Sequence, residues 1–200
     1  MANAIQKALP DSEVIVREDR ENLPYGTKTP DQLMKLVEPI LSELSKKCDV
    51  IVVACNTVST TLISQLREHI KTPLIAIEPM VKPAAEQTKA GVVAICATPT
   101  TLASKRYHWL KDTYARGVRV IEPDCSDWTQ MIETNQIDHK HIEERINQTL
   151  DENADIIVLG CTHYHWIEDL IREIARGRAT VLQPEQPVIV QLKRVLAQLS

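Results

Sequence analysis

The sequence lacks the features that mark several large classes of protein. No apolar run approaches the roughly 20 residues that a membrane-spanning helix needs, so no membrane association is expected. No segment accumulates a basic stripe, and the net charge of −4 argues against binding to nucleic acid. Cys-x-x-Cys pairs and histidine-rich clusters are also absent, which argues against a structural zinc site.

The cysteines do not form the even-numbered framework of a disulfide-rich secreted domain. There are five of them, in apolar or loop settings, which is typical of reduced thiols in a cytosolic protein. The first seven residues lack an apolar signal core, so export is not expected. Hydrophobic residues make up 44% of the chain and charged residues 25%, an ordinary balance for a soluble globular protein. The sequence therefore predicts a cytoplasmic localisation.

Short apolar runs rich in β-branched residues alternate with longer amphipathic stretches. Strands are predicted at 13–17, 50–54, 74–77, 91–96, 118–121, 156–160 and 179–182. Helices are predicted at 2–8, 31–47, 58–70, 80–89, 99–115, 138–151, 165–176 and 187–199. Strands separated by helices of this length form right-handed crossovers in a mostly parallel sheet. The predicted fold class is therefore α/β, with mostly parallel sheets flanked by helices.

Two distant segments repeat one pattern of polarity. Residues 48–57, CDVIVVACNT, match residues 154–163, ADIIVLGCTH, in polarity at nearly every position. We therefore expect two pseudo-symmetric lobes with the active site between them. Residues 1–78 and 179–200 would form lobe one, and residues 79–178 would form lobe two.

Cys55 and Cys161 occupy equivalent places in this repeat, each after an apolar strand and before a helix. The carboxyl ends of parallel strands face the crevice where open α/β sheets bind ligands, and helix amides favour a thiolate there. Most cysteines that end an apolar strand are simply small buried side chains. The matching settings instead favour two thiols that face each other across one pocket. That arrangement suits the transfer of a proton from one face of a carbon to the other.

Several other residues have purely structural explanations. His163 could cap a helix, and Thr98 could cap the helix that begins at Pro99. Glu133 has the setting of a solvated helix face. The residues expected simply to pack against neighbours are Cys48, Cys96, Trp109, Trp128 and Trp166.

Four motifs in order resemble the aspartate/glutamate racemase superfamily and, within it, the glutamate racemases. They are Leu23–Lys28 (LPYGTK), Ala54–Thr57 (ACNT), Ala97–Thr101 (ATPTT) and Leu159–Tyr164 (LGCTHY). They follow the order and approximate spacing of that family, and the resemblance covers roughly positions 3 to 196. One cysteine motif alone would be weak, whereas four in order are specific.

The resemblance implies a fold, a reaction and a biological role. Family members have two α/β lobes with the substrate between them and need neither a pyridoxal cofactor nor a metal. The implied reaction is cofactor-independent racemisation of glutamate by two bases, which supplies D-glutamate for peptidoglycan. The family commonly pairs its subunits, so a homodimer is implied as well.

The resemblance also assigns roles to individual residues. Cys55 and Cys161 match the two catalytic cysteines, and His163 matches a residue that assists the second one. Pro24, Tyr25 and Gly26 match a loop that contacts the substrate through its backbone. The residues that match groups binding the substrate's carboxylates and ammonium are Asn56, Thr57, Thr98, Thr101 and Thr162.

The chain departs from the family pattern in three places. The family begins with a strand and an Asp-Ser-Gly loop ahead of the first helix, and this chain opens at that helix. His165 stands where the family usually has proline, and residues 183–185 replace another Asp-Ser-Gly-like turn. Loss of the first strand is expected to expose ladder hydrogen-bond groups and apolar surface.

The missing start leaves two explanations open, a truncated chain or a genuine short paralogue with altered function. The pattern favours an incomplete or degenerate chain whose parent is the racemase. Three functional hypotheses follow: an active amino-acid racemase, a racemase-like binding protein without turnover, and a fragment that holds a partner through its exposed sheet edge.

Overall fold

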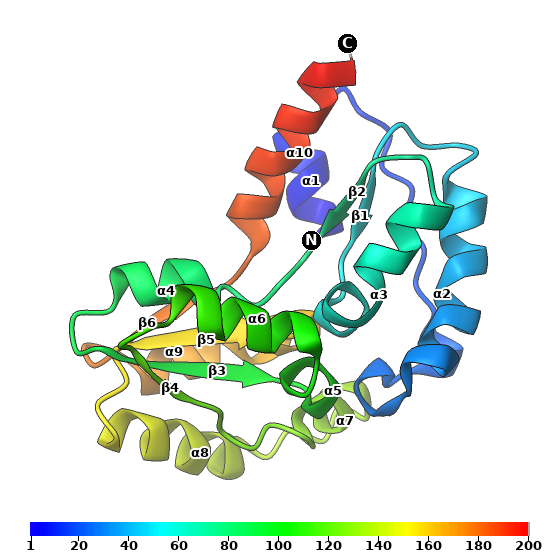
Figure 1. Cartoon of the computed structure of the whole chain (residues 1–200). Helices are drawn as coiled ribbons and strands as arrows, with labels where there is room; N and C mark the ends of the chain where they lie inside the picture. Colours follow the sequence, from blue (N-terminus) through cyan, green and yellow to red (C-terminus); the bar gives the residue numbers. More distant parts are fainter. Residues whose placement is uncertain (200) are drawn as a thin grey trace.

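Two separate parallel sheets organise the chain, as the computed structural model of residues 1–199 shows (Figure 1). The smaller sheet pairs β1 with β2, and the larger has the strand order β4-β3-β5-β6. Every strand pair is parallel. The strands are β1 (Ile51–Val53), β2 (Leu74–Ala76), β3 (Val92–Ala97), β4 (Arg119–Ile121), β5 (Ile156–Gly160) and β6 (Thr180–Leu182). The predicted α/β class with mostly parallel sheets is confirmed.

Helices connect the strands and cover both sheets. The α-helices are α1 (Ala2–Ala8), α2 (Pro30–Leu44), α3 (Asn56–His69), α4 (Val81–Gln87), α5 (Pro99–Leu102), α6 (Lys105–Tyr114), α7 (Trp128–Glu133), α8 (His139–Asp151), α9 (Glu168–Ile174) and α10 (Glu185–Leu199). Short 3₁₀ helices form at η1 (Arg20–Asn22), η2 (Tyr25–Thr27) and η3 (Thr162–Ile167). None of the helices within residues 1–199 combines the length and the apolar character that crossing a bilayer requires.

Local capping explains where several helices begin. Thr29 and Gln32 form a reciprocal capping box at the start of α2, with Pro30 in its first turn. The stretch 99–115, predicted as one helix, is divided into α5 and α6 because Ser104 caps a new start by accepting a hydrogen bond from the Tyr107 amide. The α7 helix was not predicted.

The larger sheet is buried on both faces. On one face, alternate residues of β3 and β5 pack against α7, α8, η3 and α9, around the fully buried Trp128 and Tyr164. On the other face, Val93, Ile95 and Val158 pack against α4 and α6. This two-sided burial accounts for the continuous apolar runs that the sequence shows at β3 and β5.

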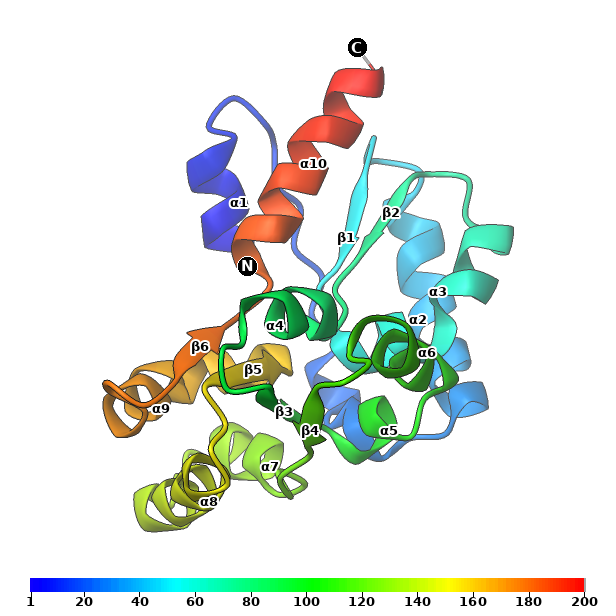
Figure 2. The ribbon, with the colours of Figure 1, turned by 60° about the vertical axis from the view of Figure 1, so that its left-hand side comes forward.

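The smaller sheet also has helices on both faces. Ile51 and Val53 pack with α2 and α3, whereas Val50 and Val52 face the cluster formed by α1 and α10. Figure 2 shows α1 beside α10 on one side of this sheet and α3 on the other. The chain thus returns to the smaller sheet through α10, although β6 immediately before it pairs with β5. The lobe boundaries at 78/79 and 178/179 stay a prediction.

The predicted strand at 13–17 is wrong. This segment has extended backbone without strand pairing, and Ile15 and Val16 are 38% and 53% exposed. The physical reason is that, among residues 1–199, β1 pairs with β2 alone and no strand lies beside this segment to pair with it. Between the segment and β1 lies a groove of about 1180 Å³. We call it the β1 groove; its walls come from α1, α2, α10, β1 and residues 11–20.

Gly160 provides a test of the packing between β3 and β5. A Cβ added there would lie 2.9 Å from the Ala97 Cβ and 3.0 Å from the Cys96 carbonyl oxygen. We expect Gly160→Ala to lower the free energy of unfolding by about 1–3 kcal/mol, because both contacts are overpacked. Urea unfolding of the variant measures this change. Arg176→Ala, at an exposed position after α9, is the control and should stay within about 0.5 kcal/mol. If the free energy of unfolding of Gly160→Ala were unchanged, β3 and β5 would be able to shift enough to accommodate the added methyl group.

Candidate active site between the two sheets

Cys55 and Cys161 lie at the carboxyl ends of β1 and β5, each at the N-cap of the following helical segment. The backbone amides of Thr57 and Val58 lower the pKa of Cys55. The amides of His163 and Tyr164, at the same two offsets along the chain, lower the pKa of Cys161. The repeat seen in the sequence is therefore also a repeat in local geometry.

The two cysteine loops touch each other across the interface between the sheets. The Thr162 hydroxyl donates a hydrogen bond of 3.2 Å to the carbonyl oxygen of Ala54, 108 residues away in sequence. Each of these residues is the immediate neighbour of one cysteine. The charge of a Cys55 thiolate also raises the pKa of Cys161, so the two sulfurs lie within electrostatic reach of each other.

Burial controls the acidity of both thiols. Desolvation raises the pKa of Cys55 above its ordinary value, although the amides of Val58 and Thr57 oppose it. Desolvation, together with the nearby Cys55, raises the pKa of Cys161 to about 12. The amides lower each thiol pKa as predicted, but in the ligand-free protein burial outweighs them. Both thiols are therefore mostly protonated near neutral pH.

Cys161 has a histidine and a carboxylate beside it. Its sulfur lies 3.8 Å from His163 Nδ1, and His163 Nε2 lies 2.6 Å from Glu133 Oε1. Thr129 adds a hydroxyl 3.9 Å from the same sulfur. This cysteine–histidine–carboxylate chain can carry a proton to and from the thiol. Glu133 was expected to be only a solvated helix residue; it is partly exposed, but its carboxylate is committed to His163.

Three buried threonines connect α3 with α5. The Thr57 hydroxyl lies 3.0 Å from that of Thr98 and 3.4 Å from that of Thr101, and Thr98 and Thr101 are 3.0 Å apart. Thr98 also caps α5 by accepting a hydrogen bond from the Thr101 amide. The cluster therefore joins the two halves of the site and holds hydroxyl groups that can turn toward an anion.

The Pro24–Gly26 loop lies against the same threonines. The carbonyl oxygen of Gly26 accepts a hydrogen bond of 2.5 Å from the Thr100 hydroxyl, and a Cβ at Gly26 would lie 2.9 Å from the Thr98 Cβ. Only glycine allows this close approach. The Tyr25 hydroxyl donates to Asp19 at 2.6 Å, which fixes its ring on the side facing Cys55.

Asn56 is a buried polar side chain without a partner. It is 2% exposed, and neither its amide nitrogen nor its amide oxygen has a hydrogen-bond partner. Buried polar groups in proteins are nearly always paired, so such an orphan points to a bound group. Its position directly after Cys55 places that group at the predicted site.

The β1 groove opens onto the predicted site at one end. Tyr25, Cys55, Thr162 and His163 line it there. The other predicted residues do not line the groove themselves. Thr57, Thr98 and Thr101 form the buried threonine cluster. Pro24, Asn56 and Cys161 are the chain neighbours of the lining residues Tyr25, Cys55 and Thr162.

Two residues at this end of the groove, Glu133 and Trp166, were not predicted to belong to the site. The role of Glu133 was not predicted because its pairing with His163 depends on α7, and the sequence has no apolar periodicity that predicts this helix. Trp166 was expected to pack against neighbours, but it is 78% exposed and lines the groove beside His163. Neither residue carries a local sequence signal for this position. Within the described residues, no group of three or more histidine, cysteine or carboxylate side chains is arranged to hold a metal ion.

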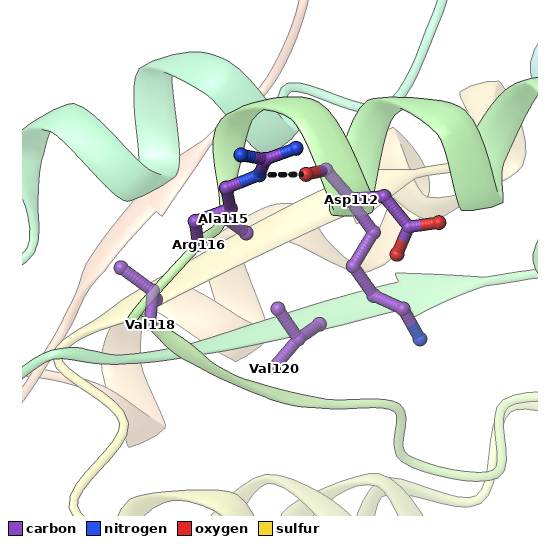
Figure 3. Close-up of a pocket in the computed structure, with 6 residues that line it drawn as sticks. Asp112, Ala115, Arg116, Val118 and Val120 are labelled. Atoms are coloured by element: carbon purple, nitrogen blue, oxygen red, sulfur yellow. Dashed lines mark hydrogen bonds between the residues drawn. The ribbon is translucent and has the colours of Figure 1, made fainter.

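A second cavity, of about 520 Å³, lies at the carboxyl end of α6, beside the chain that leads into β4 (Figure 3). Lys111, Asp112, Arg116 and Val120 are among its lining residues. The Arg116 guanidinium donates to the Asp112 carbonyl oxygen at 3.0 Å, and Lys111 pairs with Glu122 at 2.7 Å. Because none of the predicted site residues lines it, this cavity is not a candidate active site.

Comparisons with known proteins give a consistent result. The family model described as Asp/Glu/Hydantoin racemase matches residues 1–189. A glutamate racemase of Herpetosiphon aurantiacus is 34% identical over 198 residues, which are 96% of this chain and 78% of that protein. A glutamate racemase of Clostridium botulinum strain 657 is 35% identical over 196 residues, with 95% and 76% covered.

Solved structures show the same fold. Escherichia coli glutamate racemase, in complex with L-glutamate and the activator UDP-MurNAc-ala, is similar with a TM-score of 0.89 at 24% identity. The Francisella tularensis glutamate racemase in complex with D-glutamate has a TM-score of 0.78 at 25% identity. Each comparison covers 98% of this chain and 76% of the solved one.

The raised pKa of Cys161 has a measurable consequence. With a pKa of about 12, its alkylation by iodoacetamide should accelerate about tenfold per pH unit from pH 7 to 10 without a plateau, because only the thiolate reacts. Mass spectrometry of the labelled Cys161 peptide gives the rate, and circular dichroism checks that the fold persists. Free cysteine, with a pKa of about 8.5, is the control and should level off above about pH 9. A plateau at Cys161 below pH 9 would contradict the burial argument.

Proposed function

The chain belongs to the Asp/Glu/Hydantoin racemase family, and we propose that it interconverts L- and D-glutamate without a cofactor. The observation that carries this proposal is the pair of cysteines that approach one site from two sheets, joined by the Thr162–Ala54 hydrogen bond. The names of the relatives support glutamate as the substrate. Cys55 and Cys161 are the proposed catalytic residues.

Two thiols suit this reaction because racemisation needs a proton acceptor on one face of the α-carbon and a donor on the other. One cysteine, as thiolate, takes the α-proton while the C–H bond breaks. The other, as thiol, delivers its proton to the opposite face, so the two sulfurs exchange protonation states. The substrate ammonium brings a positive charge to the buried thiols and lowers their pKa when it binds. A strongly basic thiolate then forms only beside substrate.

The remaining predicted residues would bind the substrate. We assign one of its carboxylates to the unpaired Asn56 amide and to the hydroxyls of Thr57, Thr98 and Thr101. Preorganised donors at this point stabilise the negative charge that develops when the α-proton leaves. Thr162 and the backbone of the Pro24–Gly26 loop complete the binding set.

His163 and Glu133 would serve the Cys161 side of the reaction. With Nε2 paired to the Glu133 carboxylate, His163 presents Nδ1 toward the sulfur and can exchange a proton with it. Glu133 acts as a positioning residue, since its carboxylate holds the ring and stabilises its protonated form.

The Cys55 side favours a second candidate function. Within residues 1–199, no carboxylate or imidazole hydrogen-bonds to Cys55, and the nearby Asp19 is engaged by Tyr25 and Asn22. A site with one assisted and one unassisted thiol could bind glutamate without turning it over. This alternative is a racemase-like binding protein.

The proposed role extends to the cell. D-glutamate made by this reaction would supply peptidoglycan synthesis in the cytoplasm. A homodimer and independence from a pyridoxal cofactor or a metal belong to the same proposal.

Exchange of the α-proton tests the activity directly. In deuterium oxide, the protein should introduce deuterium into both L- and D-glutamate, followed by NMR. Cys55→Ser and Cys161→Ser should each slow exchange at least about 100-fold, because a hydroxyl is a far weaker base. Cys48→Ser, outside the site, is the matched control and should exchange normally. Glutamate binding by calorimetry without exchange would favour the binding protein, and absence of both would reject both functions.

Asn56 allows stability and activity to be separated. Asn56→Leu should raise the free energy of unfolding by about 1–3 kcal/mol, since it removes a buried amide that has no partner, and should abolish exchange. Thr60→Val on the same helix is the control, because it deletes a satisfied hydrogen bond to the Asn56 carbonyl. It should lose about 1 kcal/mol and keep its exchange rate. If Asn56→Leu lost stability instead, its side chain would have a partner in the protein.

A further inference from the structure

The chain first crosses from the smaller sheet to the larger one through the four residues between β2 and α4. The Ile77 amide donates to the Ser59 hydroxyl at 3.2 Å and to the Val53 carbonyl oxygen at 3.4 Å. Ile77 is therefore held by the half of the molecule that contains the smaller sheet. Pro79 has a fixed backbone angle and confines the preceding residue, Glu78, to extended conformations. The connection is thus short and stiff.

Glu78, the residue directly after Ile77, is held by the other half of the molecule. Its carboxylate accepts two hydrogen bonds from the Arg106 guanidinium of α6, from Nε to Oε1 at 2.8 Å and from Nη2 to Oε2 at 2.9 Å. Through Tyr107 and Leu110, α6 packs in the cluster that covers one face of the larger sheet. Figure 1 shows α4 and α6 side by side over that sheet. Two successive residues of the connection are therefore anchored to different halves.

Stacked rings keep the Arg106 guanidinium in place. Its central carbon lies 4.3 Å from the centre of the Trp109 ring, and the Trp109 and Tyr114 rings meet edge to face at 5.7 Å. Lys82 of α4 lies over the Tyr114 ring at 5.5 Å. Most surface ion pairs contribute little because both side chains must lose their freedom, but a bidentate pair on a stacked guanidinium is already ordered. The Glu78–Arg106 pair can therefore hold one geometry between the halves.

Helix α3 closes these contacts into a ring. It begins directly after Cys55, packs in the core of the smaller sheet, and contacts both β2 and α6. To rotate one sheet against the other, the molecule would have to break the Glu78–Arg106 pair or slide α3 along α6. Neither Glu78 nor Arg106 lines the β1 groove or belongs to the predicted site. The pair can therefore affect the cysteines only through the placement of the two sheets.

We propose that Arg106, through its pair with Glu78, is a positioning residue that sets the orientation of the two sheets and thereby the spacing of Cys55 and Cys161. Both sheets carry residues assigned to the same substrate, so only some orientations bind it. Without the pair the chain would occupy other orientations as well, and its affinity for substrate would fall with the competent fraction. The effect on the reaction rests on the proposed function, whereas the effect on orientation does not.

Distances between two spin labels test the orientation in the whole chain. p-Acetylphenylalanine in place of Lys71 and Glu143, exposed positions in different halves, accepts labels without using the cysteines. Arg106→Gln should broaden the distance distribution in pulsed electron resonance about twofold, because more orientations are then populated. Arg119→Gln is the matched control and should not broaden it, since Arg119 pairs with Glu152 inside the larger-sheet half. An unchanged distribution in Arg106→Gln overturns the proposal.

The kinetics of α-proton exchange separate positioning from stability. Arg106→Gln should raise KM for glutamate about three- to tenfold and keep kcat within about twofold, because bound glutamate itself draws the sheets together. A variant that merely unfolds more readily would lose kcat in proportion to its unfolded fraction and keep its KM. Glu78→Gln should raise KM equally, and the double variant should add no further increase, because each single change already breaks the pair.

The two measurements distinguish failure of this proposal from failure of the proposed function. If the unmodified chain does not exchange the α-proton, the proposed function fails, and the label distances alone decide whether the pair sets the orientation. If exchange occurs, a lower kcat at unchanged KM in Arg106→Gln overturns the positioning role. Additive effects of Glu78→Gln and Arg106→Gln on KM overturn it as well, since the two residues would then act separately.

Discussion

The hydrogen bond from Thr162 to the Ala54 carbonyl is the contact on which the site depends, because each partner is the chain neighbour of a cysteine. The two sheets have separate cores, and their halves also meet where α3 and η2 contact α5 and where α3 contacts α6. The threonine cluster and the close approach of Gly26 to Thr98 fix the same interface from the other side. A small movement of either sheet would change the separation of the sulfurs, so the chemistry relies on contacts that contribute little to either core.

Burial gives the two thiols their chemical character. In the empty site both are held in the neutral form, and Cys161 strongly so. A buried thiol that ionises only beside the ammonium group of the substrate is protected from side reactions and is strongly basic when it is needed. The two sides of the site are unequal within the described part of the chain, since Cys161 has His163 and Glu133 beside it whereas Cys55 has backbone amides and a threonine hydroxyl. This inequality is the central chemical question about the chain.

The fold class, the six paired strands and the two cysteine loops could all be predicted from the sequence, since apolar runs and capping residues are local signals. The prediction failed where the outcome depends on a distant neighbour. Residues 13–17 have the composition of a strand but lack a strand to pair with. Glu133 acquires its place through α7 and His163, and Trp166 is exposed because the β1 groove lies beside it. Asn56 was predicted as a ligand-binding residue by resemblance, but only the structure revealed that its amide is unpaired.

The extended segment at residues 13–17 has one more consequence. Proteases bind their substrates as extended strands, and exposed backbone outside any ladder is where chains are nicked first. This segment carries Arg17, which is a cleavage point for enzymes that cut after basic residues. A cut there would leave α1 attached only by its packing against α10. The lifetime of the chain in a cell would then be set by how well this short stretch is shielded from degradation.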